Sequence, residues 1–595
     1  MQIPLISSLV HYYKVVYGYL GKKFFVLILI FFSQGITECF GVSMLLPILN
    51  MATTNEAQDS YTQAIYHFLE YVGIEVSVFS LLVILSLAFL LKGVFKFFQN
   101  FLNSYIKLSL TKDIRIGFCH KFRSMKYDLY SNLSIGYMNN LVTTETARAV
   151  GALNRYTLLI GSIVLMFIYI FFAFSINWKI TILSLAICAC LFAMLRGMSR
   201  LSRKYSIFES ETNSKIQSLL IQAIYNFKYI KATNSFIQLY KQFFKRINEN
   251  YLCQFKNAIL MAIPISIVEP ITIFFLSILV YYYVGYLGKS VAEVMVLLLL
   301  FYKAFTYIFR FQLDWQKFNG SLGGLEMVIK ANQILNNNVE KIGSRRINTF
   351  NKAIELRSVN IGYGPKQVLF DVNLVIKKNK STGIVGESGA GKTTLFDIIT
   401  GLLTPQSGKI SIDGIDYSVL ELSSLRNMIG YVTQDPIIFN DTIANNISLW
   451  ECDNQEDVCK KLIKDAAVLA NCDKFINEAE MGHETIIGDK GVKLSGGQRQ
   501  RIAIARELFK EPEIMIFDEA TSSLDTESEL LIQRSINFLK GERTIVIIAH
   551  RLSTVRNCDY IYVMRAGRIV EEGSFDGLYG DTNSRFYSMC MAQNL

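Results

Sequence analysis

The stretch STGIVGESGAGKTTLFDIITGL, Ser381–Leu402, decides the fold of the C-terminal half of this chain. An apolar run precedes a G-x-x-x-x-G-K-T segment, and a helical pattern follows it. That order predicts a buried strand, a glycine-rich loop that binds phosphate, and a helix. Glycines allow backbone N–H groups to close around an anion, and Lys392 is expected to reach the β- and γ-phosphates of a nucleotide. The predicted nucleotide-binding residues of this loop are Gly386, Glu387, Ser388, Gly389, Ala390, Gly391, Lys392, Thr393 and Thr394.

Three further segments carry residues that suit phosphate hydrolysis. In EIMIFDEATSSLD an apolar run ends at Asp518, expected to coordinate Mg²⁺, and Glu519, expected to polarise an attacking water. In IVIIAHRLS an apolar run ends at His550, expected to bond the γ-phosphate, and YVTQDP offers Gln434 to both metal and water. The predicted catalytic residues are therefore Glu519, His550 and Gln434, and the predicted metal ligands are Thr393, Gln434 and Asp518.

A second glycine-rich helix start follows in KLSGGQRQRIAIARELF, Lys493–Phe509. A glycine-rich turn that opens a helix presents unpaired N–H groups and the positive end of the helix dipole, which favours an anion. The chain already has a phosphate loop a hundred residues earlier, so the molecule that holds the ligand of this second helix start is left open by the pattern alone. The predicted nucleotide-binding residues here are Ser495, Gly496, Gly497 and Gln498.

The first 312 residues contain long apolar runs, whereas the remainder has the pattern of an α/β protein. A helix needs about 20 mostly apolar residues to cross a bilayer. Six candidate spans meet this need, at residues 24–48, 76–98, 157–176, 178–198, 257–285 and 291–312. Residues 1–23 are interpreted as a short interfacial helix. We predict a six-helix transmembrane domain over residues 1–330, a linker over 331–352 and an α/β nucleotide-binding domain over 353–595.

Charge predicts the orientation of these spans. Residues 102–156 hold eight Lys/Arg and three Asp/Glu, and residues 196–256 hold eleven and three, whereas residues 51–75 hold four Asp/Glu and no Lys/Arg. The positive-inside rule therefore places both termini and both long loops in the cytoplasm, where the helices are expected to continue beyond the bilayer. The net charge of +11 is assigned to anionic lipid headgroups, and no nucleic-acid partner is predicted.

Two features of the membrane half bear on a transported substrate. Tyr61, Ala64, Ile65, Phe68, Leu69 and Val72 form one face of an expected amphipathic helix, which lies either on the outer leaflet or against the rim of the bundle. Lys303 and Arg310 share a face of the sixth span, and Lys92 and Lys96 lie near the inner end of the second. Lys303 and Arg310 are predicted to bind an anionic substrate; the alternative is an internal pair between Glu269 and Lys303.

The order of these motifs resembles that of the ATP-binding cassette (ABC) family over the whole chain. Tyr363 corresponds to the aromatic residue that stacks on adenine, Gly386–Thr394 to the Walker A loop, and Leu494–Gln498 to the signature. Ile514–Glu519 match Walker B, and Gln434 and His550 the Q- and H-loops. Thr485–Gly491 match the X-loop of exporters, and Ser523–Asp525 the D-loop. Six spans fused ahead of one cassette look like a type IV exporter half-transporter.

The resemblance implies which molecule holds the second ligand. In such proteins the signature helix binds the γ-phosphate of ATP held by the partner subunit. Because every motif fits the consensus, the resemblance favours a homodimer with two competent sites and with ATP and Mg²⁺ as cofactors.

The expected substrate and cellular location also follow from the family resemblance. The first span, with an external helix after it, looks like that of bacterial flippases for lipid-linked oligosaccharides. The expected function is ATP-driven export or flipping of an amphiphile, a pyrophosphate-linked oligosaccharide, across a bacterial cytoplasmic membrane. A multidrug, lipid or peptide exporter is the alternative. The six spans exclude a soluble cassette ATPase of DNA repair or translation.

Overall fold

The computed structural model divides the chain into two units, Met1–Val339 and Glu340–Leu595. It describes residues 5–53, 60–176, 178–282, 291–340, 343–363, 366–451, 457–520 and 525–593. Within these ranges it leaves the side chains of some residues undescribed, chiefly in 179–199, 264–279 and 291–300.

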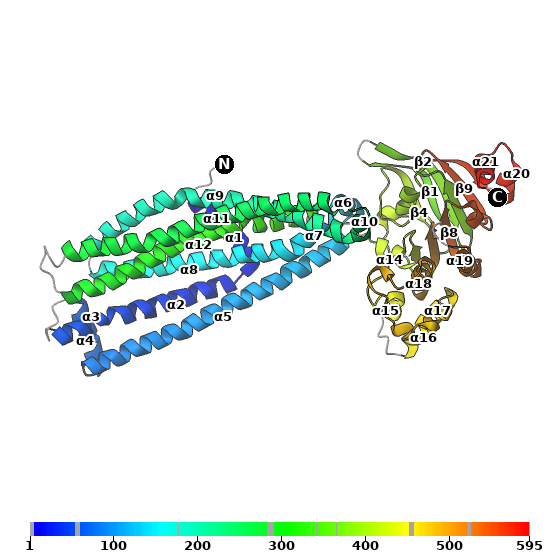
Figure 1. Ribbon diagram of the computed structural model, residues 1–595. Helices are drawn as coiled ribbons and strands as arrows, with labels where there is room; N and C mark the ends of the chain where they lie inside the picture. Colours follow the sequence, from blue (N-terminus) through cyan, green and yellow to red (C-terminus); the bar gives the residue numbers. More distant parts are fainter. Residues whose placement is uncertain are drawn as a thin grey trace. The chain divides into compact units, whose positions relative to one another are not determined.

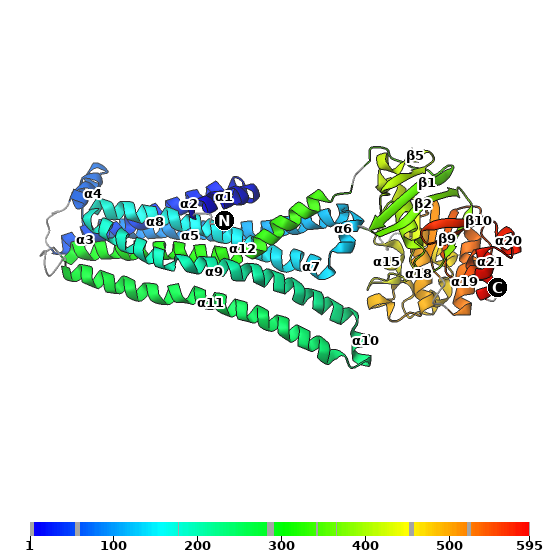
Figure 2. The ribbon, with the colours of Figure 1, turned by 90° about the horizontal axis from the view of Figure 1, so that it is seen from above.

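The first unit is helical throughout its described elements. Its helices are α1 (Leu5–Leu20), α2 (Lys23–Ser43), α3 (Leu45–Thr53), α4 (Ser60–Tyr71), α5 (Val78–Ser124), α6 (Tyr127–Asn132), α7 (Ile135–Asn140), the π-helix η1 (Leu141–Glu145), α8 (Thr146–Ile176), α9 (Trp178–Tyr225), α10 (Phe227–Ala232), α11 (Phe236–Val280) and α12 (Val291–Asn337). Figure 1 and Figure 2 show α3 and α4 at one end of this bundle and α6, α7 and α10 at the other.

The long helices exceed the thickness of a membrane. α5 has 47 residues and α9 has 48, which at about 1.5 Å per residue is roughly 70 Å, against about 30 Å for the hydrocarbon core. Among the described residues, three segments are long and apolar enough to cross a bilayer: Lys23–Met51, Val78–Ser124 and Ile135–Ser175. The other three predicted spans lie in α9, in and beyond α11, and in α12, where many side chains are outside the described residues. The helix lengths agree with extension beyond the bilayer.

Glycines on α12 allow neighbouring helices to approach closely. A Cβ atom on Gly323 would lie 2.4 Å from the carbonyl oxygen of Ser206 on α9, and one on Gly324 would lie 2.5 Å from Cβ of Arg148 on α8. Both distances are shorter than atoms tolerate, so larger residues would force these helices apart. Small residues serve this purpose wherever membrane-protein helices pack through their backbones.

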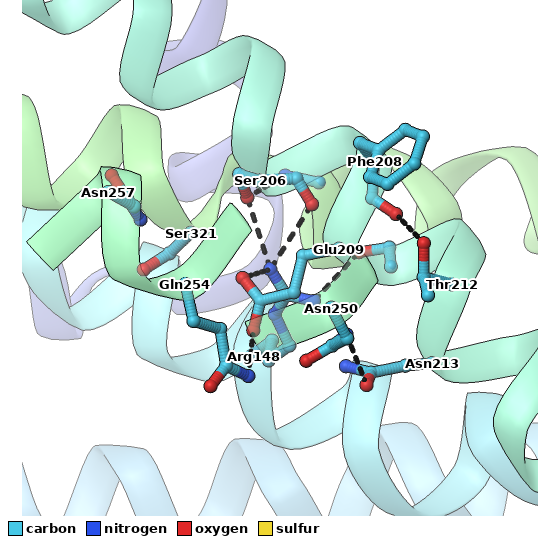
Figure 3. Close-up of polar contacts among 12 residues, drawn as sticks. Arg148, Ser206, Phe208, Glu209, Thr212, Asn213, Asn250, Gln254, Asn257 and Ser321 are labelled. Carbon is cyan, nitrogen blue, oxygen red and sulfur yellow. Dashed lines mark hydrogen bonds and ion pairs between the residues drawn. The ribbon is translucent and has the colours of Figure 1, made fainter. Parts of the chain in front are cut away.

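A polar cluster joins α8, α9 and α11 (Figure 3), and Gly323 and Gly324 lie beside two of its members, Ser206 and Arg148. Arg148 donates to Oε2 of Glu209 at 3.0 Å, to the Ser210 hydroxyl at 3.0 Å, and to the Ser206 hydroxyl and carbonyl at 3.2 and 3.3 Å. Gln254 of α11 donates to the other oxygen of Glu209 at 3.1 Å. Arg148 thus donates four hydrogen bonds between the helices, and Gln254 adds a fifth to its partner Glu209.

Glu145, the last residue of the π-helix η1, is the most deeply buried charged member of this cluster. Its side chain is fully buried, and it accepts hydrogen bonds from Asn140 at 3.2 Å and from the Ser210 hydroxyl at 2.9 Å. Arg148 lies 3.7 Å from it. A buried carboxylate is tolerated only when cations and donors surround it, so Arg148 neutralises Glu145 as well as Glu209.

The amphipathic helix expected near residues 61–72 exists as α4, but its buried face differs from the predicted one. Thr62, Ile65 and Leu69 are buried, and Ile65 and Leu69 pack with Met44 and Leu81. The prediction was wrong for Ala64 and for Phe68 and Val72, whose side chains are 61% and 53% exposed, and Tyr61 lies outside the described side chains. The helix is rotated toward Thr62 because it contacts α3 and because Ile65 and Leu69 pack with Leu81 of α5, as the rim interpretation expected.

The second unit contains two sheets. A four-stranded antiparallel sheet has the order β2-β1-β4-β5, and a six-stranded sheet has the order β10-β9-β3-β8-β7-β6. In the larger sheet all neighbours pair in parallel except β10, which is antiparallel to β9. The strands are β1 (Ala353–Tyr363), β2 (Lys366–Lys377), β3 (Ser381–Gly386), β4 (Ser407–Ile412), β5 (Ile415–Asp416), β6 (Ile429–Val432), β7 (Ile514–Asp518), β8 (Thr544–Ala549), β9 (Tyr560–Arg565) and β10 (Arg568–Gly573).

Helices cover the larger sheet, and those between residues 443 and 509 gather at one side of the unit in Figure 1. The α-helices are α13 (Lys392–Ile399), α14 (Leu422–Asn427), α15 (Ile443–Ser448), α16 (Asp457–Leu469), α17 (Asp473–Glu478), α18 (Gly496–Phe509), α19 (Thr526–Leu539), α20 (Phe575–Gly580) and α21 (Arg585–Ala592). Alternate residues of β7 enter opposite cores: Met515 and Phe517 one, Ile514 and Ile516 the other. A parallel strand covered on both faces is apolar throughout for this reason.

Arg148→Met should destabilise the first unit, because it leaves Glu145 buried without its cation. Breaking a buried charge pair from one side typically costs about 3–5 kcal/mol. The measurement is thermal unfolding of the purified protein. Arg246→Met is the matched control, since Arg246 and Glu249 form a half-exposed pair on one helix that should contribute about 1 kcal/mol or less. Equal melting temperatures for the two variants would contradict the role of the cluster.

Candidate functional site

The carboxyl ends of four neighbouring parallel strands meet at one edge of the larger sheet. The order β3-β8-β7-β6 places the phosphate loop after β3, His550 after β8, Glu519 after β7 and Gln434 two residues after β6. Ligands of open α/β sheets bind outside the carboxyl ends of the strands. Residues separated by more than a hundred positions in the sequence are brought together by this strand order.

The glycine-rich loop has the backbone that close phosphate binding requires. Gly389 and Gly391 have φ values of +78° and +99°, which residues with a Cβ rarely adopt. A Cβ on Gly386 would lie 2.4 Å from the carbonyl oxygen of Met564, whereas one on Gly389 would meet nothing within 4 Å. Gly386 is therefore required by packing against β9, and Gly389 borders open space of the kind that a phosphate needs.

Lys392 lies inside this loop at the start of α13. Its ammonium group donates to the carbonyl oxygens of Gly386 and Glu387 at 2.8 and 3.1 Å, and it lies 3.4 Å from Nε2 of His550. Burial lowers the pKa of Lys392, while the nearby carboxylates of Glu519 and Asp518 act in the opposite direction. A phosphate would supply the anion that this partly desolvated ammonium group favours.

Glu519 is held in a defined position by three contacts. Its Oε1 lies 2.9 Å from Nε2 of His550, and its Oε2 accepts from Nε2 of Gln434 at 2.8 Å. Its backbone N–H donates to the carbonyl of Ile548 on β8 at 2.9 Å. The residue has φ of +47°, a left-handed conformation that is costly for glutamate. Such strain persists only where the surroundings enforce it, and it concentrates at functional sites.

The site also contains acidic groups that sequence reasoning missed or treated only in part. Burial raises the pKa of Asp518, which accepts a hydrogen bond from the hydroxyl of Tyr431 at 3.3 Å. Burial and the charge of Asp518 raise the pKa of Asp397, in α13, to about 6. Both effects show carboxylates that lack a full complement of cations. Tyr431 adjoins the quoted Gln434 motif, so its position was visible in the sequence, but its direction toward Asp518 was not.

The oxygen donors at this edge fit a hard cation. Thr393 offers an exposed hydroxyl, Asp518 a carboxylate, and Gln434 its amide oxygen, because its NH₂ group is already directed to Glu519. Mg²⁺ prefers oxygen ligands and usually keeps waters and phosphate oxygens in its shell. Among the described residues there is no cluster of three or more His, Cys, Asp or Glu side chains that could hold a metal alone. The donor set thus fits a metal shared with a bound phosphate.

The second glycine-rich start forms the N-terminus of α18. Ser495 is its N-cap: its hydroxyl accepts from the N–H of Gln498 at 3.2 Å, and its N–H donates to the Gln498 side chain at 2.8 Å. A Cβ on Gly497 would lie 2.2 Å from Oγ of Ser528. Gly497, predicted as a ligand contact, is thus required by the packing of α18 against α19, a constraint that sequence reasoning missed.

Three predicted parts of the nucleotide site either have no hydrogen bond to the phosphate loop in the described residues or lie partly outside them: the signature segment, Tyr363 and the D-loop. In the described part of the chain no hydrogen bond joins Ser495–Gln498 to Gly386–Thr394. The side chain of Tyr363, and Ser523 in the D-loop motif, lie outside the described residues. Asp525 caps α19, accepting from the N–H of Ser528 at 3.0 Å.

The charged residues of the membrane half form a separate cluster. Glu38 on α2 accepts hydrogen bonds from Lys303 on α12 at 3.1 Å and from the Tyr307 hydroxyl at 3.4 Å, and it lies 3.0 Å from Nζ of Lys92 on α5. Its side chain is 2% exposed, against 37% for Lys303 and 25% for Lys92. The anionic partner of Lys303 in the described structure is therefore Glu38. The side chain of Glu269, its partner in the alternative interpretation, lies outside the described residues.

Arg310, seven residues after Lys303 on α12, also lies beside a buried carboxylate. Its Nε lies 3.9 Å from Asp314, and Arg155 of α8 approaches the other oxygen of Asp314 at 4.0 Å. The Arg310 side chain is 46% exposed, whereas Asp314 is 6% exposed. Lys96 of α5 donates a hydrogen bond to Oε1 of Gln99 on the same helix at 3.1 Å. Buried carboxylates thus anchor a larger number of more exposed cations.

Each of the two units matches a model of a known protein family. The profile of the ABC transporter transmembrane region matches residues 24–313, and the ABC transporter profile matches residues 369–522. HepA, a heterocyst differentiation ATP-binding protein of Nostoc sp., is 33% identical over 84% of this chain and 81% of its own length. An ATP-dependent lipid A-core flippase of Syntrophus aciditrophicus is 30% identical over 83% and 82%.

Two other comparisons extend this result. The alpha-hemolysin translocation ATP-binding protein HlyB of Escherichia coli O6:H1 is 32% identical over 87% of this chain and 73% of its own. A solved structure of a bacterial Atm1-family ABC exporter with ATP bound superposes with a TM-score of 0.77 at 22% identity, covering 97% of this chain and 99% of that one, and so shares its fold. With a membrane region and an ATP-binding domain in one polypeptide, the chain belongs to the ABC transporter family and has the architecture of an exporter half-transporter.

Proposed function

We propose that this ABC exporter works as a homodimer that moves an anionic, lipid-linked pyrophosphate oligosaccharide across the cytoplasmic membrane of a bacterium. The observation that carries the choice of substrate is the cation-rich cluster around Glu38. In the described part of the chain, Lys92 and Lys303 share the carboxylate of Glu38, and Arg155 and Arg310 share that of Asp314. An excess of cations in a membrane segment is costly unless an anion compensates it.

The exposures of these groups support a binding role. Each carboxylate is almost fully buried, while the cations beside it are a quarter to a half exposed. An ammonium group has three N–H donors, so Lys303 keeps donors beyond the one directed to Glu38. A substrate phosphate could then bind the accessible side of a cation that a buried carboxylate already orients. One relative is named for flipping of a lipid and another for translocation of a protein, so a lipid or peptide exporter remains the competing function.

ATP hydrolysis at the edge of the sheet would supply the energy. Lys392 and the loop N–H groups would bind the phosphates of ATP, and Thr393, Asp518 and Gln434 would hold Mg²⁺, which neutralises phosphate charge when bound. Glu519 would accept a proton from the attacking water, with His550 and Gln434 fixing the orientation of its carboxylate. The strained conformation of Glu519 supports this role.

A second chain would complete each site. The Ser495 helix start lacks hydrogen bonds to the phosphate loop of its own chain in the described structure, yet it presents N–H groups and a dipole that suit an anion. In the proposed homodimer it would bind the γ-phosphate of ATP held by the partner subunit. Hydrolysis would separate the two nucleotide-binding domains and move the long cytoplasmic helices.

Glu519→Gln should bind ATP normally and lose turnover, because the amide cannot accept the proton of the attacking water. Removal of a positioned base typically lowers the rate about 10²–10⁴-fold. ATPase assays and equilibrium binding of ATP test this, and the variant should also accumulate an ATP-bound dimer. Glu542→Gln, at an exposed turn, is the control and should retain full activity. Near-normal hydrolysis by Glu519→Gln would refute the assignment.

Lys392→Ala and Ser495→Arg should each abolish hydrolysis in a homodimer, but they should complement each other in a mixed dimer. The first change disrupts the phosphate loop of its own chain, and the second blocks the ATP of its partner. A mixed dimer therefore keeps one intact site and has one site disrupted twice. Co-expression with two affinity tags, followed by an ATPase assay of the doubly purified dimer, should recover partial activity. Full ATPase activity in a detergent-solubilised monomer would exclude the shared site.

Lys303→Ala/Arg310→Ala should fold and keep basal ATPase activity but lose stimulation by pyrophosphate-linked lipids and lose their flipping. Proteoliposomes containing polyprenyl-pyrophosphate glycans, drugs or peptides provide the comparison, with Lys107→Ala as an exposed control. If the charges are only structural, Lys303→Ala should instead lower the melting temperature, and adding Glu38→Gln should restore it. Unimpaired flipping by a well-folded double variant would favour a drug-type exporter.

A further inference from the structure

The C-terminal helix α21 contacts two segments of the nucleotide site that lie far from it in sequence. Phe586 and Cys590 anchor the helix, since both are fully buried in the core beside the larger sheet. Glu571 on β10 fixes its start by accepting hydrogen bonds from the N–H groups of Arg585 and Phe586 at 2.6 and 3.0 Å. The helix is thus fixed to the core, so its two ends can orient the segments that they contact, at Glu387 and at His550.

At the far end of α21, the side chain of Gln593 bridges the segment that carries His550. Its NH₂ group donates to the carbonyl oxygen of His550 at 2.7 Å, and its Oε1 accepts from the N–H of Leu552 at 2.9 Å. One amide therefore binds the backbone on both sides of Arg551. Gln593 is itself fixed as the C-cap of α21, because its N–H donates to the carbonyl of Cys590 at 3.0 Å.

His550 needs such support because the sheet no longer holds it. The parallel pairing of β3 with β8 ends at Val385 and Ala549, one residue before His550. Its imidazole nevertheless has to meet Glu519 at 2.9 Å. A backbone that can rotate at this point would carry the ring away from Glu519, and displacements of about 1 Å at a reacting centre can lower rates about 100-fold.

The other end of α21 offers a weaker contact to the same site. Arg585 pairs with Glu387 of the phosphate loop, but the two side chains are 29% and 63% exposed. Exposed ion pairs contribute little because water and salt screen them. Gln593 is exposed as well, but its amide binds two backbone groups through hydrogen bonds of good length and does not depend on an ion pair, so it is the stronger candidate of the two.

We propose that Gln593 is a positioning residue for hydrolysis, which fixes the backbone of His550 so that its imidazole holds the Glu519 carboxylate toward the attacking water. The inference rests on the proposed roles of His550 and Glu519. Gln593 touches neither the nucleotide nor Glu519, and acts through His550 alone. Its loss should therefore slow the chemical step and leave ATP binding unchanged.

The test compares Gln593→Ala with Gln593→Glu in the full-length protein. Glutamate has the size of glutamine and can still accept from Leu552, but it cannot donate to the carbonyl of His550. Both variants should lower kcat about 3- to 10-fold with the KM for ATP and the melting temperature unchanged. Met591→Ala, on the exposed face of the same helix, is the matched control and should behave as wild type.

A double-mutant cycle separates this inference from the proposed function. In a His550→Ala background, Gln593→Ala should cause no further loss of residual hydrolysis, because its effect requires His550. Wild-type kcat in Gln593→Ala, or an additive loss in the double variant, would overturn the positioning role while leaving His550 in place. A kcat loss matched by a lower melting temperature would assign Gln593 a structural role instead. Full activity in His550→Ala itself would overturn the proposed role of His550 and this inference with it.

Discussion

The parallel pairing of β3, β8, β7 and β6 is the constraint on which the nucleotide site depends. Each strand ends at the same edge of the sheet, so the residue that follows each strand enters the same space. Lys392, His550, Glu519 and Gln434 are brought into contact only by this order. The register between β7 and β8 also fixes Glu519 directly, since its N–H bonds to Ile548 and holds a backbone conformation that glutamate avoids.

Buried charge imposes a comparable constraint on the helical unit. Glu38, Glu145 and Asp314 are nearly inaccessible, and each lies beside one or more cations on other helices or on its own. A carboxylate without such a partner would be too costly in a medium of low polarity. These pairs therefore restrict how α2, α5, α8, α9 and α12 can rotate about their axes. Gly323 and Gly324 add the close approach that lets Arg148 reach its partners.

The two clusters differ in what their charges can do. Around Arg148, four hydrogen bonds and two carboxylates satisfy one guanidinium group, which suits a fixed connection between helices. Around Glu38, one buried carboxylate is shared by Lys92 and Lys303, and both ammonium groups are partly exposed. The ammonium groups around Glu38 are therefore more accessible than the guanidinium group of Arg148, which is 16% exposed.

Local sequence patterns were enough to predict those parts of this protein that short stretches of chain encode. Strand, glycine-rich loop and helix follow one another within Ser381–Leu402, and the apolar runs have the length of membrane spans, so neither required knowledge of distant residues. Only the tertiary structure decided which distant groups meet. Glu38 and Lys303 are 265 positions apart, Gly497 is required by Ser528, and Gln593 reaches His550 across 43 positions. The burial of Thr62 in place of Phe68 on α4 has the same origin. Periodicity shows that a helix has an apolar face, but the rotation that selects its partners is set by packing against neighbouring helices and strands.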